Sequence, residues 1–358
     1  MKIFLVVLLA IIFVIPVVAL IVVNFLFAGE DQSQFDLPAH QKVKMRASAS
    51  AAHQDMAAVI VADMATAPKL GREEQLKFMR GQMDARGVAF QINAEIQQVA
   101  ADGVSGEWVL APNADPDRRL LYIHGGAYMV GSPKSHRQIT SRLSEIARAA
   151  VLVVDYRLLP EHSRINGISD CRVAYQWLLE NGPDGQSHAQ KLIVAGDSSG
   201  GNLALSTIAW ARDEGLRQAD AVIVMSPQTD LTLSSPSLVI NIPTDVMQGA
   251  SFGPVVKAPK PLRLLFSFLM HRMYPADPLV SPLLGDLNDL PPTLVQVSDA
   301  EMFYDDGARY VNKANAQGSV AQLQVWPGAM HVWQAFEVPE ADEAFGEMGK
   351  FVAAHAGE

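Results

Sequence analysis

The amino-acid sequence predicts an α/β fold whose central sheet is mostly parallel. Short runs of Val, Ile and Leu recur between longer helical patterns, and these runs lack the apolar–polar alternation of half-exposed strands. The chain has 358 residues, of which 49% are hydrophobic and 18% charged, so it can bury the core of one large domain. We expect helices on both faces of this sheet.

The strand and helix patterns start to alternate near Val88. Strands are expected at 88–96, 107–110, 119–123, 151–155, 191–195, 221–225, 293–297 and 322–326. Helices are expected at 136–147, 167–180, 200–214, 305–316 and 340–353. Two antiparallel strands at the start of the sheet fit this order. We assign residues 88–358 to one domain.

Two segments break the alternation. Residues 42–87 have helical spacing without a strand pattern, and 231–275 are rich in proline around the apolar stretch 264–270. A structureless loop as long as 231–275 is uncommon, so it should be a functional insertion. We expect both segments to form a helical cap over the sheet. The alternative for the insertion is an extra helix packed on the flank of the domain.

The N-terminus predicts a membrane anchor. Residues 3–23 are apolar around Pro16, and about 21 to 25 such residues suffice to cross a bilayer core. A secretory signal peptide normally has a shorter apolar stretch, and cleavage after Ala28 would place Leu26 where a small residue is needed. We therefore expect residues 1–28 to be an uncleaved transmembrane helix, followed by a polar linker at 29–41.

The charges that flank this segment predict its orientation. Lys2 precedes it, whereas Glu30, Asp31 and Asp36 follow it. Since positive charge tends to stay in the cytoplasm, the rest of the chain should lie on the periplasmic or extracellular side.

Composition excludes several classes of partner and cofactor. The net charge of −10 argues against nucleic acid, because phosphate binding needs clustered Lys and Arg. The single cysteine, Cys171, cannot form an intrachain disulfide and is expected in the core. The sequence has no His-Glu-x-x-His motif, cysteine pair or nucleotide-binding glycine signature, so neither a metal nor a cofactor is expected. It indicates no oligomeric state.

The residues Gly196-Asp197-Ser198-Ser199-Gly200-Gly201 fit Gly-x-Ser-x-Gly, a sharp turn between a strand and a helix that exposes a serine hydroxyl. Its surroundings match, because an apolar strand pattern precedes Ser198 and a helical pattern follows it. A serine that merely caps the helix is the structural alternative. We expect Ser198 to be a nucleophile of acyl transfer on an α/β-hydrolase fold.

A serine nucleophile needs a base and an acid, which follow it in this fold in the order acid, then histidine. Beyond the strand expected at 293–297 only His331 and His355 remain, and His355 is almost at the end of the chain. His331 is therefore the expected base. Asp299 and Glu301 could each orient its imidazole, and spacing alone does not separate them.

The segment His124-Gly125-Gly126-Ala127-Tyr128 follows another buried strand and can aim backbone N–H groups at a developing oxyanion. We expect the donors of Gly125, Gly126 and Ser199 to form this oxyanion hole. Ala127 can present its own N–H if its φ remains negative.

These motifs together resemble the bacterial branch of the hormone-sensitive-lipase family of α/β-hydrolases. The resemblance runs from about Arg119 to Phe336 and includes the patterns at 156–162, 277–283, 290–292 and 305–307. It implies that Glu301 is the acid, where Asp is the usual residue, with Asp299 in reserve. It further implies that His124 holds the glycine loop in shape. Ala127 and Ser199 stand where the family often has Gly and Ala.

The resemblance implies a serine carboxylesterase that acts on short- to medium-chain acyl esters, either small molecules or lipids. A deacetylase or amidase with the same three residues is the alternative enzyme. A non-catalytic ligand receptor on the same fold is the alternative outside enzymes, although such a protein would usually lack one of the three.

Overall fold

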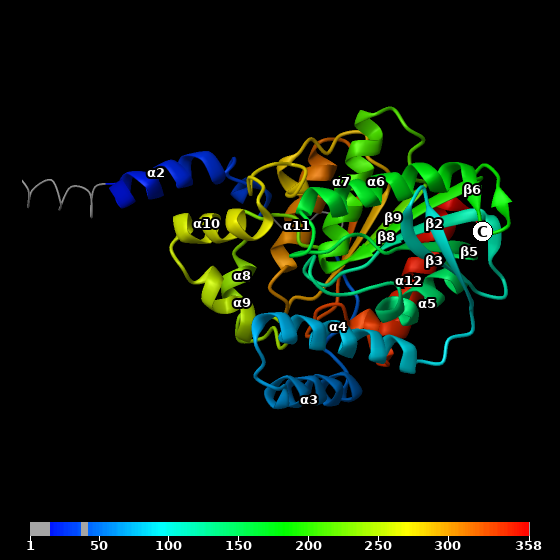
Figure 1. The fold of residues 1–358 in the computed structure, drawn as a ribbon, viewed down its shortest axis with the longest axis horizontal. Helices are drawn as coiled ribbons and strands as arrows, with labels where there is room; N and C mark the ends of the chain where they lie inside the picture. Colours follow the sequence, from blue (N-terminus) through cyan, green and yellow to red (C-terminus); the bar gives the residue numbers. More distant parts are fainter. Residues whose placement is uncertain (1–14, 37–41, 358) are drawn as a thin grey trace, which may run out of the picture.

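The structure, a computed structural model, describes residues 15–36 and 42–357. In this part of the chain one nine-stranded sheet forms the centre, with the strand order β1-β11-β10-β9-β8-β4-β5-β3-β2 (Figure 1). Its strands are β1 (Lys42–Lys44), β2 (Glu95–Ala101), β3 (Val104–Leu110), β4 (Asp115–Ile123), β5 (Ala149–Val154), β8 (Lys191–Asp197), β9 (Ala221–Met225), β10 (Thr293–Val297) and β11 (Ala321–Val325). Strand β3 pairs antiparallel with β2 and β5, and the remaining neighbours are parallel. The predicted mostly parallel sheet with antiparallel pairing at its start is confirmed.

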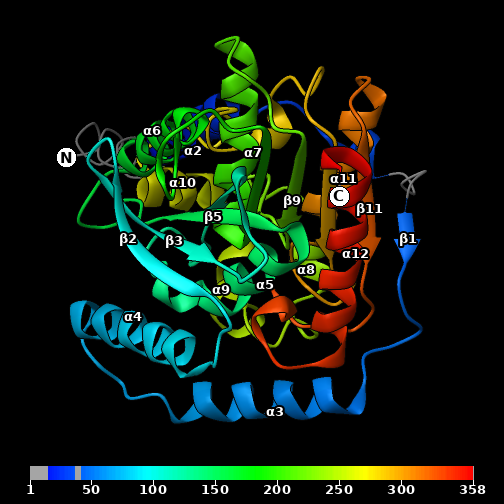
Figure 2. The ribbon, with the colours of Figure 1, turned by 90° about the vertical axis from the view of Figure 1, so that its right-hand side faces the viewer.

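Helices cover both faces of the sheet, as predicted (Figure 2). One face carries α5 (Arg137–Ala147) and α12 (Pro339–Ala356), and the other carries α6 (Arg164–Glu180), α7 (Ser198–Asp213) and α11 (Tyr304–Ala316). Successive residues of β4 show the division, because Leu120 packs with the first group and Leu121 with the second. Cys171 lies on α6 and is fully buried, as expected.

Several boundaries differ from the sequence prediction, and in two places the type of element differs as well. The expected strand at 88–96 begins only at Glu95, because the helix before it continues to Ala89. The short apolar run near Val88 does not distinguish a helix end from a strand. Residues 42–44 form the edge strand β1 rather than the start of a helix, and Lys-Val-Lys carries little strand signal.

The two segments outside the alternation are largely helical. The first contains α3 (Ala51–Thr66) and α4 (Arg72–Ala89), and the insertion contains α8 (Ser237–Ile240), α9 (Gly249–Val256) and α10 (Lys260–His271). Shorter elements complete the described chain: the hairpin β6 (Asn181–Gly182) with β7 (Gly185–Gln186), and the 3₁₀ turns η2 (Ser33–Phe35), η3 (Lys134–His136), η4 (Pro282–Leu284) and η5 (Trp333–Ala335).

The N-terminal prediction is covered only in part. Residues 15–27 form α2 (Ile15–Phe27), whereas residues 1–14 of the expected anchor lie outside the described residues. No helix in the described part of the chain combines the length and the apolar character needed to traverse a bilayer.

Candidate active site

Ser198 stands at the junction of β8 and α7, where the strand turns sharply into the helix. Its φ is +50°, a left-handed conformation that is unusual for a residue with a side chain. The turn depends on glycine nearby, because a Cβ at Gly200 would lie 2.1 Å from the carbonyl oxygen of Ile123. The backbone thus holds Ser198 in a strained position of the kind found at functional sites.

The structure brings together the three side chains that the sequence singled out. Ser198 Oγ lies 2.9 Å from Nε2 of His331, and Nδ1 of the same ring lies 2.6 Å from Oε2 of Glu301. A carboxylate can only accept, so the Nδ1–H of His331 donates to Glu301, and Nε2 of the neutral ring accepts from the Ser198 hydroxyl. These two hydrogen bonds place Nε2 of His331 where it can take the proton of the Ser198 hydroxyl.

The two candidate acids take different positions in the loop after β10. Glu301 is fully buried, and its Oε1 accepts the Ser298 N–H at 2.8 Å while Oε2 faces His331. Asp299 is exposed, and its carboxylate accepts the N–H of Gly328. Only Glu301 therefore has the geometry to orient the imidazole.

Electrostatics also favour a proton acceptor at His331. Burial alone would lower the pKa of His331, but the hydrogen bond and charge of Glu301 outweigh it and raise the pKa above its ordinary value. The carboxylates of Asp245 and Asp197 act in the same direction. The ring is therefore more basic than a free imidazole.

Gly125 does not fit the predicted oxyanion hole. Its N–H donates to Oδ1 of Asp197 at 2.9 Å, and a Cβ at Gly125 would approach Oδ2 of the same carboxylate to 2.1 Å. The donor of Gly125 is therefore engaged inside the protein, and the expectation that it binds the oxyanion is wrong. Asp197, the second residue of the nucleophile motif, holds the glycine loop against the strand end.

The residues that follow Gly125 in the loop do reach the cavity. Gly126, Ala127 and Ser199 line the cavity above Ser198, whereas Gly125 does not. Ala127 has φ +52° and not the negative φ given above as the condition for its N–H, so any donor there is presented by left-handed backbone. Left-handed backbone at Gly126 and Ala127 turns the chain so that the carbonyl of Gly126 accepts the N–H groups of Met129 and Val130.

Two further histidines near the loop have structural surroundings. His124 is fully buried, its Nδ1 meets the Gly125 carbonyl at 2.8 Å, and burial lowers its pKa to about 3. It is thus a neutral ring that braces the loop. His136 lies 3.4 Å from Asp197. Burial alone would lower the pKa of His136, but the Asp197 carboxylate outweighs burial and raises it.

Ser198 opens onto an apolar cavity of about 750 Å³. Helices α3, α4, α9 and α10 contribute to its wall, together with loops at the carboxyl ends of the strands. The apolar side chains of the wall include Met56, Ile60, Met79, Met83, Phe252 and Met270. A cavity of this size can enclose most of a small organic ligand.

The insertion is joined to the acid loop. Nδ2 of Asn241 donates to the carbonyls of Asp299 and Glu301, and Asp245 accepts the N–H of Met302. Sequence reasoning missed both residues, because their only local signal is the capping of nearby turns. They couple the position of Glu301 to the insertion.

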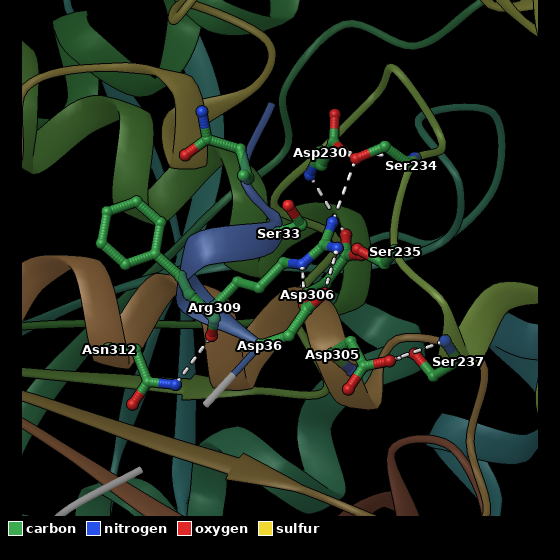
Figure 3. Close-up of polar contacts among 12 residues, drawn as sticks. Ser33, Asp36, Asp230, Ser234, Ser235, Ser237, Asp305, Asp306, Arg309 and Asn312 are labelled. Carbon is green, nitrogen blue, oxygen red and sulfur yellow. Dashed lines mark hydrogen bonds and ion pairs between the residues drawn. The ribbon is translucent and has the colours of Figure 1, made fainter. Parts of the chain in front are cut away.

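A second polar cluster fixes the base of the insertion to α11 (Figure 3). Asp306 accepts the N–H groups of Thr229 and Asp230, and Asp305 accepts the N–H of Ser237. Burial and the charge of Asp230 raise the pKa of Asp306 to about 7. Among residues 15–36 and 42–357, no group of three or more His, Cys, Asp or Glu side chains could hold a metal ion.

Comparison with known proteins gives consistent matches. Residues 120–335 match a family model described as alpha/beta hydrolase fold. An acetyl-hydrolase of Streptomyces hygroscopicus is 34% identical over 71% of this chain and 81% of its own length. The carboxylesterase/phospholipase LipF of Mycobacterium tuberculosis is 36% identical over 73% of this chain and 66% of its own length. The crystal structure of an esterase from the bacterial hormone-sensitive lipase family matches with a TM-score of 0.74 at 29% identity, over 86% of this chain and all of that one.

Proposed function

Since the chain belongs to the bacterial hormone-sensitive-lipase branch of the α/β-hydrolases and is an esterase, we propose a substrate class and a mechanism for it. It hydrolyses short- to medium-chain acyl esters through an acyl-enzyme intermediate on Ser198. The observation that carries the proposal is the unbroken hydrogen-bond chain from Ser198 through His331 to Glu301 at the floor of an apolar cavity.

The reaction follows from this chain. Nε2 of His331 accepts the hydroxyl proton as Ser198 Oγ attacks the ester carbonyl carbon. Glu301 holds the ring and stabilises it while it is charged. His331 then gives the proton to the leaving alcohol, and a water molecule deprotonated by the same ring releases the acid and restores Ser198.

The tetrahedral oxyanion needs donors that are free and face the substrate. We propose the backbone N–H groups of Gly126, Ala127 and Ser199, because all three residues line the cavity. One such donor typically contributes about 3 kcal/mol to transition-state stabilisation. The N–H of Ser199 also lies in the first turn of α7, where the helix dipole favours negative charge.

The cavity supports the substrate class. Its volume and apolar wall suit an acyl chain of short to medium length, and the names of the relatives include an acetyl-hydrolase and a carboxylesterase/phospholipase. We propose that residues 42–87 and 231–275 act together as a cap that encloses the acyl chain of the substrate, because both segments contribute to the cavity wall.

The test is a hydrolysis screen with p-nitrophenyl esters of rising acyl length, combined with labelling by a fluorophosphonate probe. Wild-type protein should hydrolyse the short and medium esters and take up the label, and Ser198→Ala should lose both. Ser199→Ala is the matched control, since the substitution leaves the neighbouring N–H in place and should retain turnover. Undiminished turnover by Ser198→Ala would refute the assignment of the nucleophile.

For localisation we propose a single-pass anchor within residues 1–28, with the catalytic domain on the periplasmic or extracellular side. The apolar sequence from residue 3 to residue 23 and the acidic residues that follow it support this proposal. Protease added to intact spheroplasts should digest the domain. A domain that stays intact until the membrane is permeabilised would contradict this orientation.

A further inference from the structure

Helix α10 exposes an apolar stripe. Leu264, Ser267 and His271 of this helix are buried against the domain. Leu262, Phe266 and Leu269 follow one another at helical spacing on another side, and they are 45%, 40% and 51% exposed. An aligned stripe of large apolar side chains in water indicates a contact surface rather than scattered exposure.

Helix α2 extends this surface. It lies beside α10 in the fold (Figure 1). The ring of Phe27 stacks on that of Phe268 with 4.8 Å between their centroids, and its centroid lies 5.3 Å from that of Tyr274. Further apolar side chains of α2 are exposed, namely Val17, Val18, Ile21, Val22, Phe25 and Leu26. We call these residues and the α10 stripe the α2–α10 surface.

The α2–α10 surface is fixed to the catalytic domain. Asp36, a few residues after α2, pairs with Arg309 of α11, and Asn312 donates to the carbonyl of Phe35 (Figure 3). Because α10 packs along α2 and the following turn is pinned to α11, any surface that receives α2 also receives α10.

The charges around the apolar stripe of α10 indicate what kind of surface it contacts. Between Asp245 and Asp277 the sequence holds four Lys or Arg and no Asp or Glu, although the whole chain carries a net charge of −10. Lys257, Lys260 and Arg272 are exposed near the ends of α10. A helix with apolar residues on one face and cations beside them is typical of segments that lie in the interface of an anionic bilayer.

A second copy of the chain fits this surface less well. A symmetric contact through α10 would bring the cations of each copy toward those of the other, where like charges repel. A bilayer with anionic lipids meets both the stripe and its cations. The sequence before α2 also continues apolar from residue 3, in line with the same occupant.

We propose that the α10 stripe sits in the headgroup region of an anionic bilayer, beside the point where the anchor proposed above enters it through α2, and delivers bilayer-resident acyl esters to the cavity. Phe266 belongs both to the stripe and to the cavity wall, and Met270, one turn further along α10, also lines the cavity. An ester that leaves the bilayer beside Phe266 therefore reaches the cavity without crossing water. The delivery step rests on the proposed esterase function, whereas the bilayer contact does not.

The contact can be measured with an environment-sensitive fluorophore on the full-length chain. Leu269→Cys provides the attachment site, because the single native cysteine, Cys171, is fully buried. Val320→Cys is the matched control, since Val320 is 52% exposed just before β11, at the end of the sheet opposite Ser198. Both are labelled with nitrobenzoxadiazole and reconstituted into vesicles of phosphatidylcholine with phosphatidylglycerol.

We expect the emission of the label at residue 269 to rise roughly two-fold in these vesicles, as for a group buried about 5–10 Å into the interface, and the label at 320 to stay unchanged. The combined substitution of Lys257, Lys260 and Arg272 by Gln should reverse the rise. Since each cation near an anionic surface strengthens binding about five-fold, the three together should weaken the contact on the order of 100-fold.

Turnover separates this proposal from the esterase function. The combined Gln variant should hydrolyse a bilayer-embedded ester on the order of 100-fold more slowly than wild type, by loss of the charge term, while its rate on soluble p-nitrophenyl acetate stays the same. Equal signals from residues 269 and 320, or a disulfide between two chains of the unlabelled Leu269→Cys variant without vesicles, would overturn the bilayer contact. Loss of wild-type turnover on the soluble ester would instead overturn the proposed function.

Discussion

The imidazole of His53 on α3 accepts, through Nε2, the backbone N–H of Met330 at 2.8 Å. Met330 directly precedes His331, and His53 is buried with its Nδ1 3.4 Å from Oε2 of Glu340. A helix far from the nucleophile in sequence thus holds the loop that presents the base. Burial lowers the pKa of His53, so a neutral ring suits the role of acceptor.

We predict that His53→Leu lowers kcat more than it raises KM. The substitution leaves the buried N–H of Met330 without an acceptor, which costs about 1–3 kcal/mol and allows the His331 loop to shift. His53→Gln should restore much of the rate, because its amide oxygen can accept the same bond. Steady-state kinetics on a p-nitrophenyl ester distinguish the variants, and equal kcat in both would show that Met330 needs no acceptor.

The sheet and its covering helices were predictable from sequence, because buried parallel strands are continuous apolar runs and the helices between them have a clear period. The strand at 293–297 and the helix at 305–316 show this, since both lie within one residue of their predicted bounds. Strand β1 was not predictable, since Lys42–Lys44 is ordered by pairing with β11 rather than by its own pattern.

At the site, the Gly-x-Ser-x-Gly motif led to Ser198, the chain order of the fold led to His331, and the resemblance led to Glu301. The oxyanion donors were harder to predict, because the choice depends on the direction of each backbone N–H within the loop that follows β4. Asp197 accepts a hydrogen bond from the N–H of Gly125, and no local sequence pattern predicts that bond. His53 was missed for a similar reason, since its partner Met330 lies at the other end of the chain.

We predict that Glu301→Gln and Asp299→Asn differ greatly in activity. The amide at 301 cannot hold the same tautomer of His331 or stabilise its charged form, so kcat should fall on the order of 10³- to 10⁴-fold. Asp299→Asn removes only the charge of an exposed side chain, because its amide oxygen can still accept the Gly328 N–H, and the variant should stay close to wild type. Single-turnover measurements with an activated ester test this pair. A large loss at Asp299 and a small one at Glu301 would reverse the assignment of the acid.

The pH dependence of kcat/KM should report the raised pKa of His331. The ring accepts the Ser198 proton only while neutral, so activity rises with pH through the pKa of the free enzyme. Because Glu301 raises this pKa against the effect of burial, the midpoint should lie above about 6.5, the ordinary value for histidine. In Glu301→Gln the midpoint of the residual activity should move to lower pH. A midpoint below the ordinary value in the wild type would contradict the electrostatic argument.

Asp197 should matter for activity without touching the substrate. Its carboxylate accepts the Tyr122 hydroxyl and the Gly125 N–H, and it lies beside His136. Asp197→Asn keeps the shape but removes the charge opposite His136, so we expect lower thermal stability and a fall in kcat of about ten-fold as the loop loosens, equivalent to about 1.4 kcal/mol. Asp155→Asn is a control at the end of β5, which is separated from β8 by β4. If Asp197→Asn left the melting temperature and kcat unchanged, the loop that contains Gly125 would not need the charge of Asp197 to keep its position.

Arg80 of α4 joins residues 42–87 to the loop that follows β4. Its Nε donates to the carbonyl of Met129 at 2.8 Å, and its Nη2 donates to the carbonyl of Leu159 at 3.0 Å. The same guanidinium forms an ion pair with Glu161, which is half-exposed. Hydrogen bonds from a charged group to carbonyls contribute about 1.5–3 kcal/mol each, whereas an exposed ion pair contributes at most about 1 kcal/mol.

Arg80→Met should therefore lower both the melting temperature and kcat/KM, the latter roughly ten-fold, because Met129 continues the turn that begins at Gly126. Glu161→Gln removes only the ion pair and should leave both quantities near wild type. Thermal unfolding and ester hydrolysis measured on the same preparations separate the two contributions. If Glu161→Gln proved as damaging as Arg80→Met, the ion pair and not the carbonyl contacts would hold α4 to the loop that follows β4.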